Sequence, residues 1–356
     1  MTSLPSHPTH ITPAWLNEAL AERYKGVDVA SVDVTEIKEG TNSNARIRLA
    51  YNESVGLPES MFLKLPPLDE ARRAAVNRTG MGRREALFYL HLADEVKMRV
   101  PSVYVARFDE ASGAFVLLLE DLEATGCSLP DPTAGITPEH AFAAMSDFAA
   151  LHVQFETEER RRTKAHWVEL NRGGGDYGTK MLEYGLAHHR EKLSDEFAAI
   201  SRLYIDHQFA VEKAWAAGPI TVLQGDGHLG NLFVDRDRPG FLDWGIIHLG
   251  TPIRDVGYFI AMSLSPENRR AHERALLERY LEARREAGGA EIPFDEAWSS
   301  HRVQASYTVA ASCQVVTFPE DATPQRRVFA AAFLARSEAV IADLDARSAL
   351  REMAGL

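Results

Sequence analysis

Residues 222–245 constrain the fold of this chain more than any other stretch. An apolar segment leads into a loop with three glycines that contains Asp226, and Asn231 follows five positions later. A second short apolar segment then presents Asp243. Two carboxylates and an amide at the ends of short strands, beside glycines that allow close approach, suit a site for Mg²⁺ and phosphate. Hairpin turns alone would explain the glycine pairs, but not the ordered series of Asp226, Asn231 and Asp243.

The overall composition limits the classes of function. The chain has 356 residues, of which 45% are hydrophobic and 25% charged, as in ordinary globular proteins. This length fits two domains or one large bilobal unit. The net charge of −12 argues against a nucleic-acid surface, which needs a basic patch. The acidic balance is compatible with a cationic substrate without establishing one.

Cysteine usage and hydropathy indicate the compartment. Cys127 and Cys313 are the only cysteines, and no Cys-His cluster has the spacing of a zinc site. The first ten residues lack the charged and apolar regions of a signal peptide, and no apolar run approaches the ~20 residues that span a bilayer. We therefore expect a soluble, cytoplasmic protein that does not bind membranes.

The first third of the sequence has the pattern of a sheet. Alternating and apolar runs predict strands, and two of them flank a turn that contains Gly40, Thr41 and Asn42. The backbone N–H groups of such a turn can fold over phosphates, and a plain hairpin turn is the alternative. The predicted strands are residues 27–37, 45–50, 61–65, 103–108 and 114–119.

Two charged residues stand out in this region. Lys64 is the single charge in an otherwise apolar strand, and Glu85 lies near the beginning of a helix predicted at residues 82–96. Taken singly, Lys64 suits a solvent-facing strand position and Glu85 an exposed first helical turn, where a negative charge is favourable.

From residue 138 the apolar spacing becomes helical. His152 lies at an apolar position of the first of these helices, where a buried, hydrogen-bonded histidine is a better expectation than a catalytic one. The predicted helices are residues 139–155, 180–189, 196–216, 255–264, 267–286, 294–316 and 325–344.

The series Gly-Asp226-x-x-x-x-Asn231, then Asp243-Trp-Gly, resembles the catalytic loop and metal motif of the aminoglycoside phosphotransferase and choline kinase-like superfamily, a relative of the protein kinases. The resemblance covers residues 39–255 and implies an α+β, bilobal, protein-kinase-like fold. An N-terminal lobe, residues 1–120, would hold about five mostly antiparallel strands and a helix and would bind nucleotide. A larger, mainly helical lobe, residues 121–356, would hold the catalytic loop and the acceptor.

The resemblance also implies roles for individual residues. Asp226 would be the catalytic aspartate, and Asn231 and Asp243 would bind Mg²⁺. Lys64 would contact the phosphates of ATP (or GTP) and would be held by Glu85. Further nucleotide contacts would come from Gly40, Thr41 and Asn42 of the turn and from the backbone of Glu120 and Leu122 in the linker between the lobes.

The acceptor class follows from the chain after Asp243. Roughly ten residues separate Gly245 from the next predicted helix, too few for the long activation segment on which protein kinases dock a peptide. We therefore expect a kinase that phosphorylates a hydroxyl of a small molecule, acting as a monomer or homodimer. The alternatives are a nucleotide-binding pseudokinase with a regulatory role and, less in keeping with the sequence, a protein kinase.

Two positions near the catalytic loop depart from or extend the family pattern. Gln224 stands where the family usually has histidine directly before Gly-Asp, so we expect altered support of the loop but not lost activity. Asp255 resembles a family acid that braces the catalytic loop, and a charge at a helix N-terminus is the alternative reading.

Overall fold

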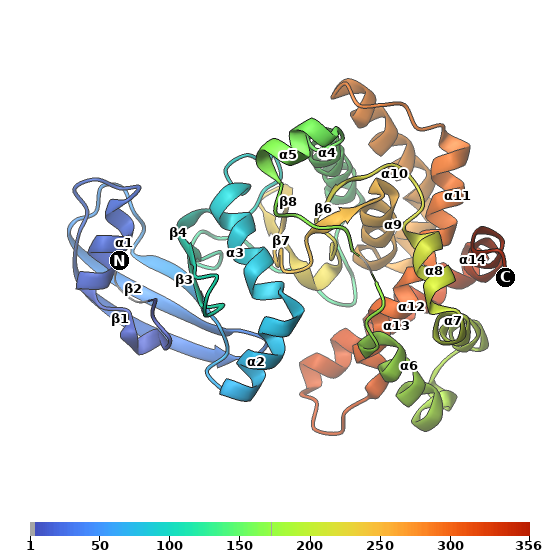
Figure 1. The fold of residues 1–356 in the computed structure, drawn as a ribbon, viewed down its shortest axis with the longest axis horizontal. Helices are drawn as coiled ribbons and strands as arrows, with labels where there is room; N and C mark the ends of the chain where they lie inside the picture. The colour runs from blue at the N-terminus through green and yellow to red at the C-terminus, as the bar shows by residue number, and fades with distance from the viewer. Residues whose placement is uncertain (1–3, 172) are drawn as a thin grey trace. The chain divides into compact units, whose positions relative to one another are not determined.

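The computed structural model describes residues 4–171 and 173–356, which form two compact units (Figure 1). The first unit runs to Ser128 and includes residues 240–247, and the second comprises residues 129–239 and 248–356. The segment that carries Asp243 therefore belongs to the first unit, whereas Asp226 and Asn231 belong to the second. The lobe limits of 1–120 and 121–356 remain a prediction.

The first unit is built on a five-stranded sheet in the order β1-β2-β3-β5-β4, with every neighbouring pair antiparallel (Figure 1). The predicted strands all form, and β1 and β2 extend beyond their predicted ends to make a long hairpin. The strands are β1 (Asp28–Glu39), β2 (Ser43–Glu53), β3 (Ser60–Leu65), β4 (Val103–Phe108) and β5 (Phe115–Glu120).

The strand alternation decides which side chains face the core of this unit. In β3, Met61, Leu63 and Leu65 are fully buried and pack with α1 (Pro13–Ala21) on one face of the sheet. Because successive side chains point to opposite faces, Lys64 lies on the other face. The short helix α2 (Glu70–Thr79), which the sequence pattern did not predict, precedes α3 (Met81–His91), which ends earlier than the predicted residue 96.

Helices dominate the second unit, as predicted. Two predicted helices are divided: residues 196–216 form two helices that meet at His207, and residues 294–316 form two helices and a 3-10 segment. The final helix was not predicted. The elements are α4 (Pro138–Gln154), α5 (Glu158–Lys164), α6 (Tyr177–His188), α7 (Asp195–Asp206), α8 (Gln208–Trp215), α9 (Pro252–Ser263), α10 (Pro266–Glu286), α11 (Phe294–Ala305), α12 (Tyr307–Ala311), α13 (Pro324–Asp343) and α14 (Ala346–Ala354).

Helix α9 lies at the centre of the second unit, since every one of its residues is buried. Next to it in sequence, β9 (His248–Gly250) pairs with β6 (Thr221–Leu223), the strand that leads into the catalytic loop. The other short pair is β7 (Leu232–Asp235) with β8 (Arg238–Phe241), the hairpin between Asn231 and Asp243. Helix α9 and the β6–β9 pair therefore support the loop that carries Asp226.

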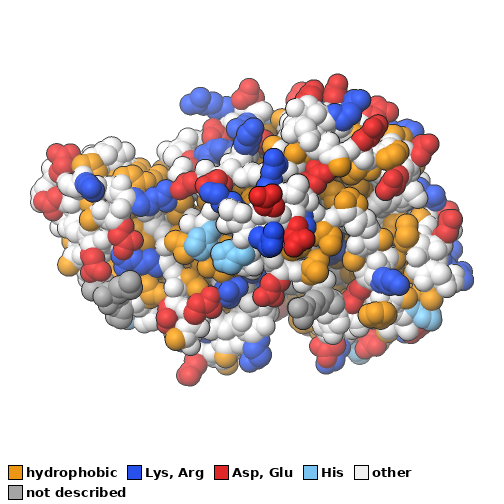
Figure 2. Space-filling model, turned by 45° about the horizontal axis from the view of Figure 1, so that its top comes forward, with side chains coloured by type: hydrophobic (Ala, Val, Ile, Leu, Met, Phe, Trp, Pro, Cys, Tyr) orange, Lys and Arg blue, Asp and Glu red, His pale blue; other side chains and the backbone are white. Residues whose placement is uncertain are grey.

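Two surface properties bear on partners. In the part of the chain that the structure describes, no helix is both long and apolar enough to traverse a membrane. On the face shown in Figure 2, acidic and basic side chains are interspersed and not segregated by sign.

Candidate active site

Lys64 and Glu85 form a close ion pair inside the first unit. The Lys64 Nζ donates to Glu85 Oε1 at 2.7 Å and lies 2.6 Å from Oε2, and the two side chains are only 11% and 4% exposed. Burial acts to lower the pKa of Lys64, but the carboxylates of Glu85 and Asp243 outweigh it and raise that pKa. Lys64 is therefore a fixed, fully protonated ammonium, and Asp243 lies near enough to act on it.

The Asp243-Trp-Gly segment is anchored on α3 within the same unit. Asp243 has a left-handed backbone, with φ +49°, a strained conformation that aspartate tolerates better than most residues. The Trp244 ring stacks on Phe88 at 3.7 Å between centroids, and Arg84 Nε donates to the Gly245 carbonyl at 2.8 Å. Sequence reasoning missed Arg84 and Phe88, although the two are four residues apart in the predicted helix and so share one of its faces.

The turn between β1 and β2 holds buried polar atoms without partners. Gly40 N–H donates to the Asn42 carbonyl at 2.9 Å, which closes the turn. Asn42 Oδ1, Ser43 Oγ and Asn44 Oδ1 are all buried and form no hydrogen bond. Such atoms are costly unless a ligand or water satisfies them. This supports a ligand-binding role for residues 40–42, and Thr41 is exposed at the tip.

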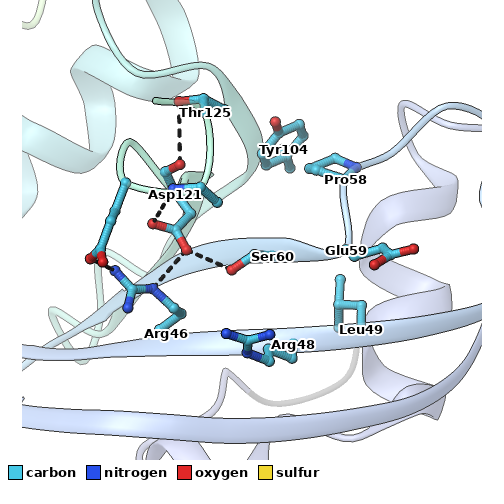
Figure 3. Close-up of a pocket in the computed structure, with 11 residues that line it drawn as sticks. Arg46, Arg48, Leu49, Pro58, Glu59, Ser60, Tyr104, Asp121 and Thr125 are labelled. Carbon is cyan, nitrogen blue, oxygen red and sulfur yellow. Dashed lines mark hydrogen bonds and ion pairs between the residues drawn. The ribbon is translucent and has the colours of Figure 1, made fainter. Parts of the chain in front are cut away.

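The linker after β5 is fixed by two ion-pair clusters, and Figure 3 shows the one around Asp121. Asp121 Oδ2 accepts from Ser60 Oγ at 2.5 Å and lies 2.7 Å from Arg46 Nε. Burial acts to raise the pKa of Asp121, but these hydrogen bonds outweigh it and hold the pKa below its usual value. Arg46 also reaches Glu123 at 2.6 Å. A cavity of about 590 Å³ opens beside this cluster, lined in part by Arg48 and Thr125.

The carboxylate of Glu120 fixes the start of the linker by hydrogen bonds. It accepts from Arg99 at 2.6 and 2.9 Å, from Ser102 N–H at 3.0 Å and from Thr125 Oγ1 at 2.9 Å. The Leu122 carbonyl accepts from Cys127 N–H at 2.8 Å, whereas its own N–H has no acceptor among the described residues. The Leu122 N–H thus remains available to a ligand, as its predicted backbone role requires.

The catalytic loop brings Asp226 and Asn231 together in the second unit. Asn231 Nδ2 donates to the Asp226 carbonyl at 3.0 Å and to its Oδ2 at 2.9 Å. Gln224 is fully buried, and its Oε1 accepts from Asp226 N–H at 2.7 Å. Gln224 therefore supports the loop directly, at the position where the resemblance leads us to expect histidine. Gly225 needs its glycine, since its φ is +87°.

A buried network lies beneath this loop. Asp255 Oδ2 accepts from Gln224 N–H at 2.7 Å and Oδ1 from Gly225 N–H at 2.8 Å. The imidazole of His152, fully buried as predicted, lies 3.4 Å from Asp255 Oδ2 through Nε2 and 2.8 Å from the Tyr280 hydroxyl through Nδ1. Burial lowers the pKa of His152, only partly opposed by Asp255. The bracing role expected of Asp255 is thus observed, and Tyr280 extends it to α10.

The residues predicted for Mg²⁺ offer suitable donors. Because both hydrogens of the Asn231 amide face Asp226, its Oδ1 points elsewhere and accepts no hydrogen bond in the described chain. Asn231 and Asp243 would supply an amide oxygen and a carboxylate, and Mg²⁺ takes one or two such ligands together with water and substrate phosphates. Among residues 4–171 and 173–356 there is no group of three His, Cys, Asp or Glu side chains that could hold a metal. A Mg²⁺ site with only one or two protein ligands does not need such a group.

Comparison with known proteins identifies the family. The sequence profile of the phosphotransferase enzyme family matches residues 33–298. Choline kinase LicA from Streptococcus pneumoniae has a similar structure, with a TM-score of 0.52, 12% identity, and coverage of 92% of this chain and 98% of that one. A choline/ethanolamine kinase family protein from Mesorhizobium loti has a TM-score of 0.47 and 17% identity, with coverage of 94% of this chain and 99% of that one. The macrolide 2′-phosphotransferase MphH from Brachybacterium faecium has a TM-score of 0.45 and 19% identity, with coverage of 88% of this chain and 96% of that one.

A search of curated proteins finds no match. The family profile spans most of the chain, and the first solved structure above shares its kinase-like architecture of an antiparallel sheet followed by a larger helical part. The predicted fold is confirmed. The chain belongs to the phosphotransferase enzyme family and is a phosphotransferase.

Proposed function

We propose that this protein transfers the γ-phosphoryl group of ATP, or of GTP, to a hydroxyl of a small molecule. The observation that carries the proposal is the position of Asp226. Its carboxylate is oriented by Asn231, its loop is tied to Asp255, and its side chain keeps 23% of its surface exposed. A carboxylate that is rigidly held yet accessible is suited to receiving a hydroxyl proton.

The chain's own residues supply positioning and charge. The acceptor hydroxyl oxygen would bond to the γ-phosphorus while the bond to the β,γ-bridging oxygen breaks and the nucleoside diphosphate leaves with the electron pair. The hydroxyl proton would pass to Asp226. Lys64, held by Glu85, would neutralise phosphate charge, and the turn at Gly40, Thr41 and Asn42 would cover the phosphates. Mg²⁺ bound by Asn231 and Asp243 would neutralise charge on the phosphate oxygens.

The structure after Asp243 supports a small acceptor. Only residues 246–251 lie between Gly245 and α9, and they include the three-residue strand β9. A peptide-docking segment has no room there. Both cysteines, Cys127 and Cys313, are free thiols, which is in keeping with cytoplasmic action.

The test is an ADP- or GDP-release screen of the whole protein over hydroxyl compounds, with Mg²⁺ and either nucleotide. We expect acceptor-dependent release by the wild type and a loss of at least ~10³-fold for Asp226→Asn, which retains the shape of the side chain but not its basicity. Nucleotide binding without release across the whole panel would favour the pseudokinase instead.

A further inference from the structure

Arg254, in the first turn of α9, is a buried cation without an anionic partner. The residue is only 9% exposed, and its Nε has no hydrogen-bond acceptor. No carboxylate lies within 4.0 Å of its guanidinium in the part of the chain that the structure describes. Of the other deeply buried arginines of this unit, Arg269 and Arg284 form ion pairs with acids, and Arg336 donates from Nε and both terminal nitrogens to backbone carbonyls.

The position of Arg254 costs stability on two counts. An arginine removed from water without a counter-ion is unfavourable, and the N-terminal end of a helix favours anions over cations. The guanidinium carbon lies 3.5 Å from the centroid of the Tyr307 ring, and this cation–π contact offsets only part of that cost. Tyr307 is a neutral partner for the guanidinium and supplies no counter-charge, so a bound anion is the better explanation for a charge at this position.

Arg254 and Asp226 both act on the same two tyrosines, Tyr258 and Tyr307. Burial raises the pKa of Tyr258 and of Tyr307, and on both hydroxyls Asp226 acts in the same direction while Arg254 acts against it. The two tyrosine rings lie 5.5 Å apart. Tyr307 keeps part of its surface exposed, whereas Tyr258 is buried, so of the two rings only Tyr307 can contact a ligand.

His228, in the loop that carries Asp226, links that carboxylate to further aromatic rings. His228 Nε2 lies 3.7 Å from Asp226 Oδ2, and its ring packs edge-on against Tyr258 at 6.2 Å and Phe333 at 5.3 Å. Phe329 lies 6.1 Å from the same ring. Aromatic rings of this kind accommodate the apolar body of a ligand, while the charged groups fix its orientation.

We propose that Arg254 binds an anionic group of the acceptor, so that the preferred substrates are small alcohols that also carry a carboxylate or phosphate. This inference rests on the proposed function. The acceptor would place its hydroxyl at Asp226, its apolar body on the partly exposed rings of Tyr307 and Phe329, and its anion at Arg254. The anion takes no part in the transfer, in which the hydroxyl oxygen gains the phosphoryl group and loses its proton to Asp226. Because the chain has a net charge of −12, a local cation is needed to hold such a substrate.

The test compares three matched pairs: 3-(hydroxymethyl)benzoate with its methyl ester, 4-hydroxybutanoate with its amide, and glycerol 3-phosphate with glycerol. Nucleoside diphosphate release is measured for the wild type, Arg254→Met and Arg254→Lys. We expect the wild type to favour at least one anionic member by tenfold or more in kcat/KM, Arg254→Met to reduce that preference below twofold, and Arg254→Lys to retain an intermediate one. The third pair distinguishes phosphate from carboxylate as the anion.

Arg274→Met is the matched control, because Arg274 also stacks on aromatic rings, at 4.8 Å from Phe294 and 4.6 Å from Trp298, but on the exposed side of α10. It should leave the preference unchanged. An equal kcat/KM for anionic and neutral members, or a preference that persists in Arg254→Met, overturns the inference while leaving phosphotransfer intact.

Thermal unfolding with the same compounds, without nucleotide, separates this inference from the proposed function. The anionic member should raise the Tm of the wild type more than its neutral partner does, and Arg254→Met should abolish the difference even if no compound is phosphorylated. Arg254→Met without ligand should unfold at the wild-type temperature or above, since it removes an unpaired buried charge. A Tm lowered by several degrees, or no stabilisation by any anionic compound, overturns the inference.

Discussion

Asp255→Asn tests the bracing of the catalytic loop. The carboxylate accepts two buried backbone N–H groups, Gln224 at 2.7 Å and Gly225 at 2.8 Å. An asparagine side chain has one acceptor oxygen, so one N–H would face an NH₂ group instead. Losing one hydrogen bond to a charged acceptor costs about 1.5–3 kcal/mol, and the stranded N–H adds about 1 kcal/mol or more. We expect the free energy of unfolding to fall by about 3 kcal/mol, within the 5–15 kcal/mol of a typical domain, so that the variant still folds.

The variant should also lose more activity than its lowered unfolding free energy alone explains. The freed N–H groups belong to the two residues that precede Asp226, so the catalytic carboxylate should move, and a displacement of about 1 Å is enough to reduce kcat by about 10²-fold. Urea unfolding and nucleoside diphosphate release are measured side by side, with Asp237→Asn at an exposed position as control. An Asp255→Asn protein whose unfolding free energy and kcat both match those of the control would refute the bracing role.

Three further predictions concern other parts of the site. Glu85→Gln should lower the free energy of unfolding by about 3 kcal/mol, because it removes the carboxylate that pairs directly with the buried ammonium of Lys64, and should raise KM for the nucleotide; an unchanged urea midpoint and KM would contradict the pairing. His152→Gln should flatten the acid side of the stability curve. Burial lowers the pKa of His152 in the folded state, so unfolding takes up a proton below the ordinary value of about 6.5, and the stability present above that pH is lost as pH falls, at up to about 1.4 kcal/mol per pH unit. Urea unfolding at pH 7.5 and 5.5 should therefore show the gap between wild type and variant narrowing at the lower pH; a constant gap would count against a neutral His152. Asn231→Leu should weaken activation by Mg²⁺ at least tenfold in a metal titration of product formation, and an unaltered titration would remove Asn231 from the metal site.

Local patterns were sufficient to predict much of the fold. Alternating and apolar runs located all five strands of the first unit, and the single lysine in β3 proved to pair with a glutamate 21 positions later in sequence. Helical spacing failed where a break leaves the apolar pattern intact: the chain bends at His207 between α7 and α8 without any glycine or proline. The Gly80 C-cap that separates α2 from α3 was a signal that could have been used.

Contacts between distant segments could not be predicted from one sequence. The stacking of Trp244 on Phe88 and the bond from His152 to Tyr280 join residues more than one hundred positions apart, and no local periodicity specifies such pairs. The absence of a contact, as at Arg254, is equally hard to predict from the sequence. In sequence Arg254 is one more charge beside Asp255, and only the structure reveals that it is buried without an anionic partner.

The central claim is that Asp226 accepts the hydroxyl proton during phosphoryl transfer. The most direct measurement is mass spectrometry of acceptor mixtures incubated with the wild type or Asp226→Asn and either ATP or GTP with Mg²⁺, alongside nucleotide titrations of both proteins. The account predicts an acceptor heavier by one phosphoryl group with the wild type only, and similar nucleotide affinity for both. Phosphorylated acceptor formed at comparable rates by Asp226→Asn would contradict it.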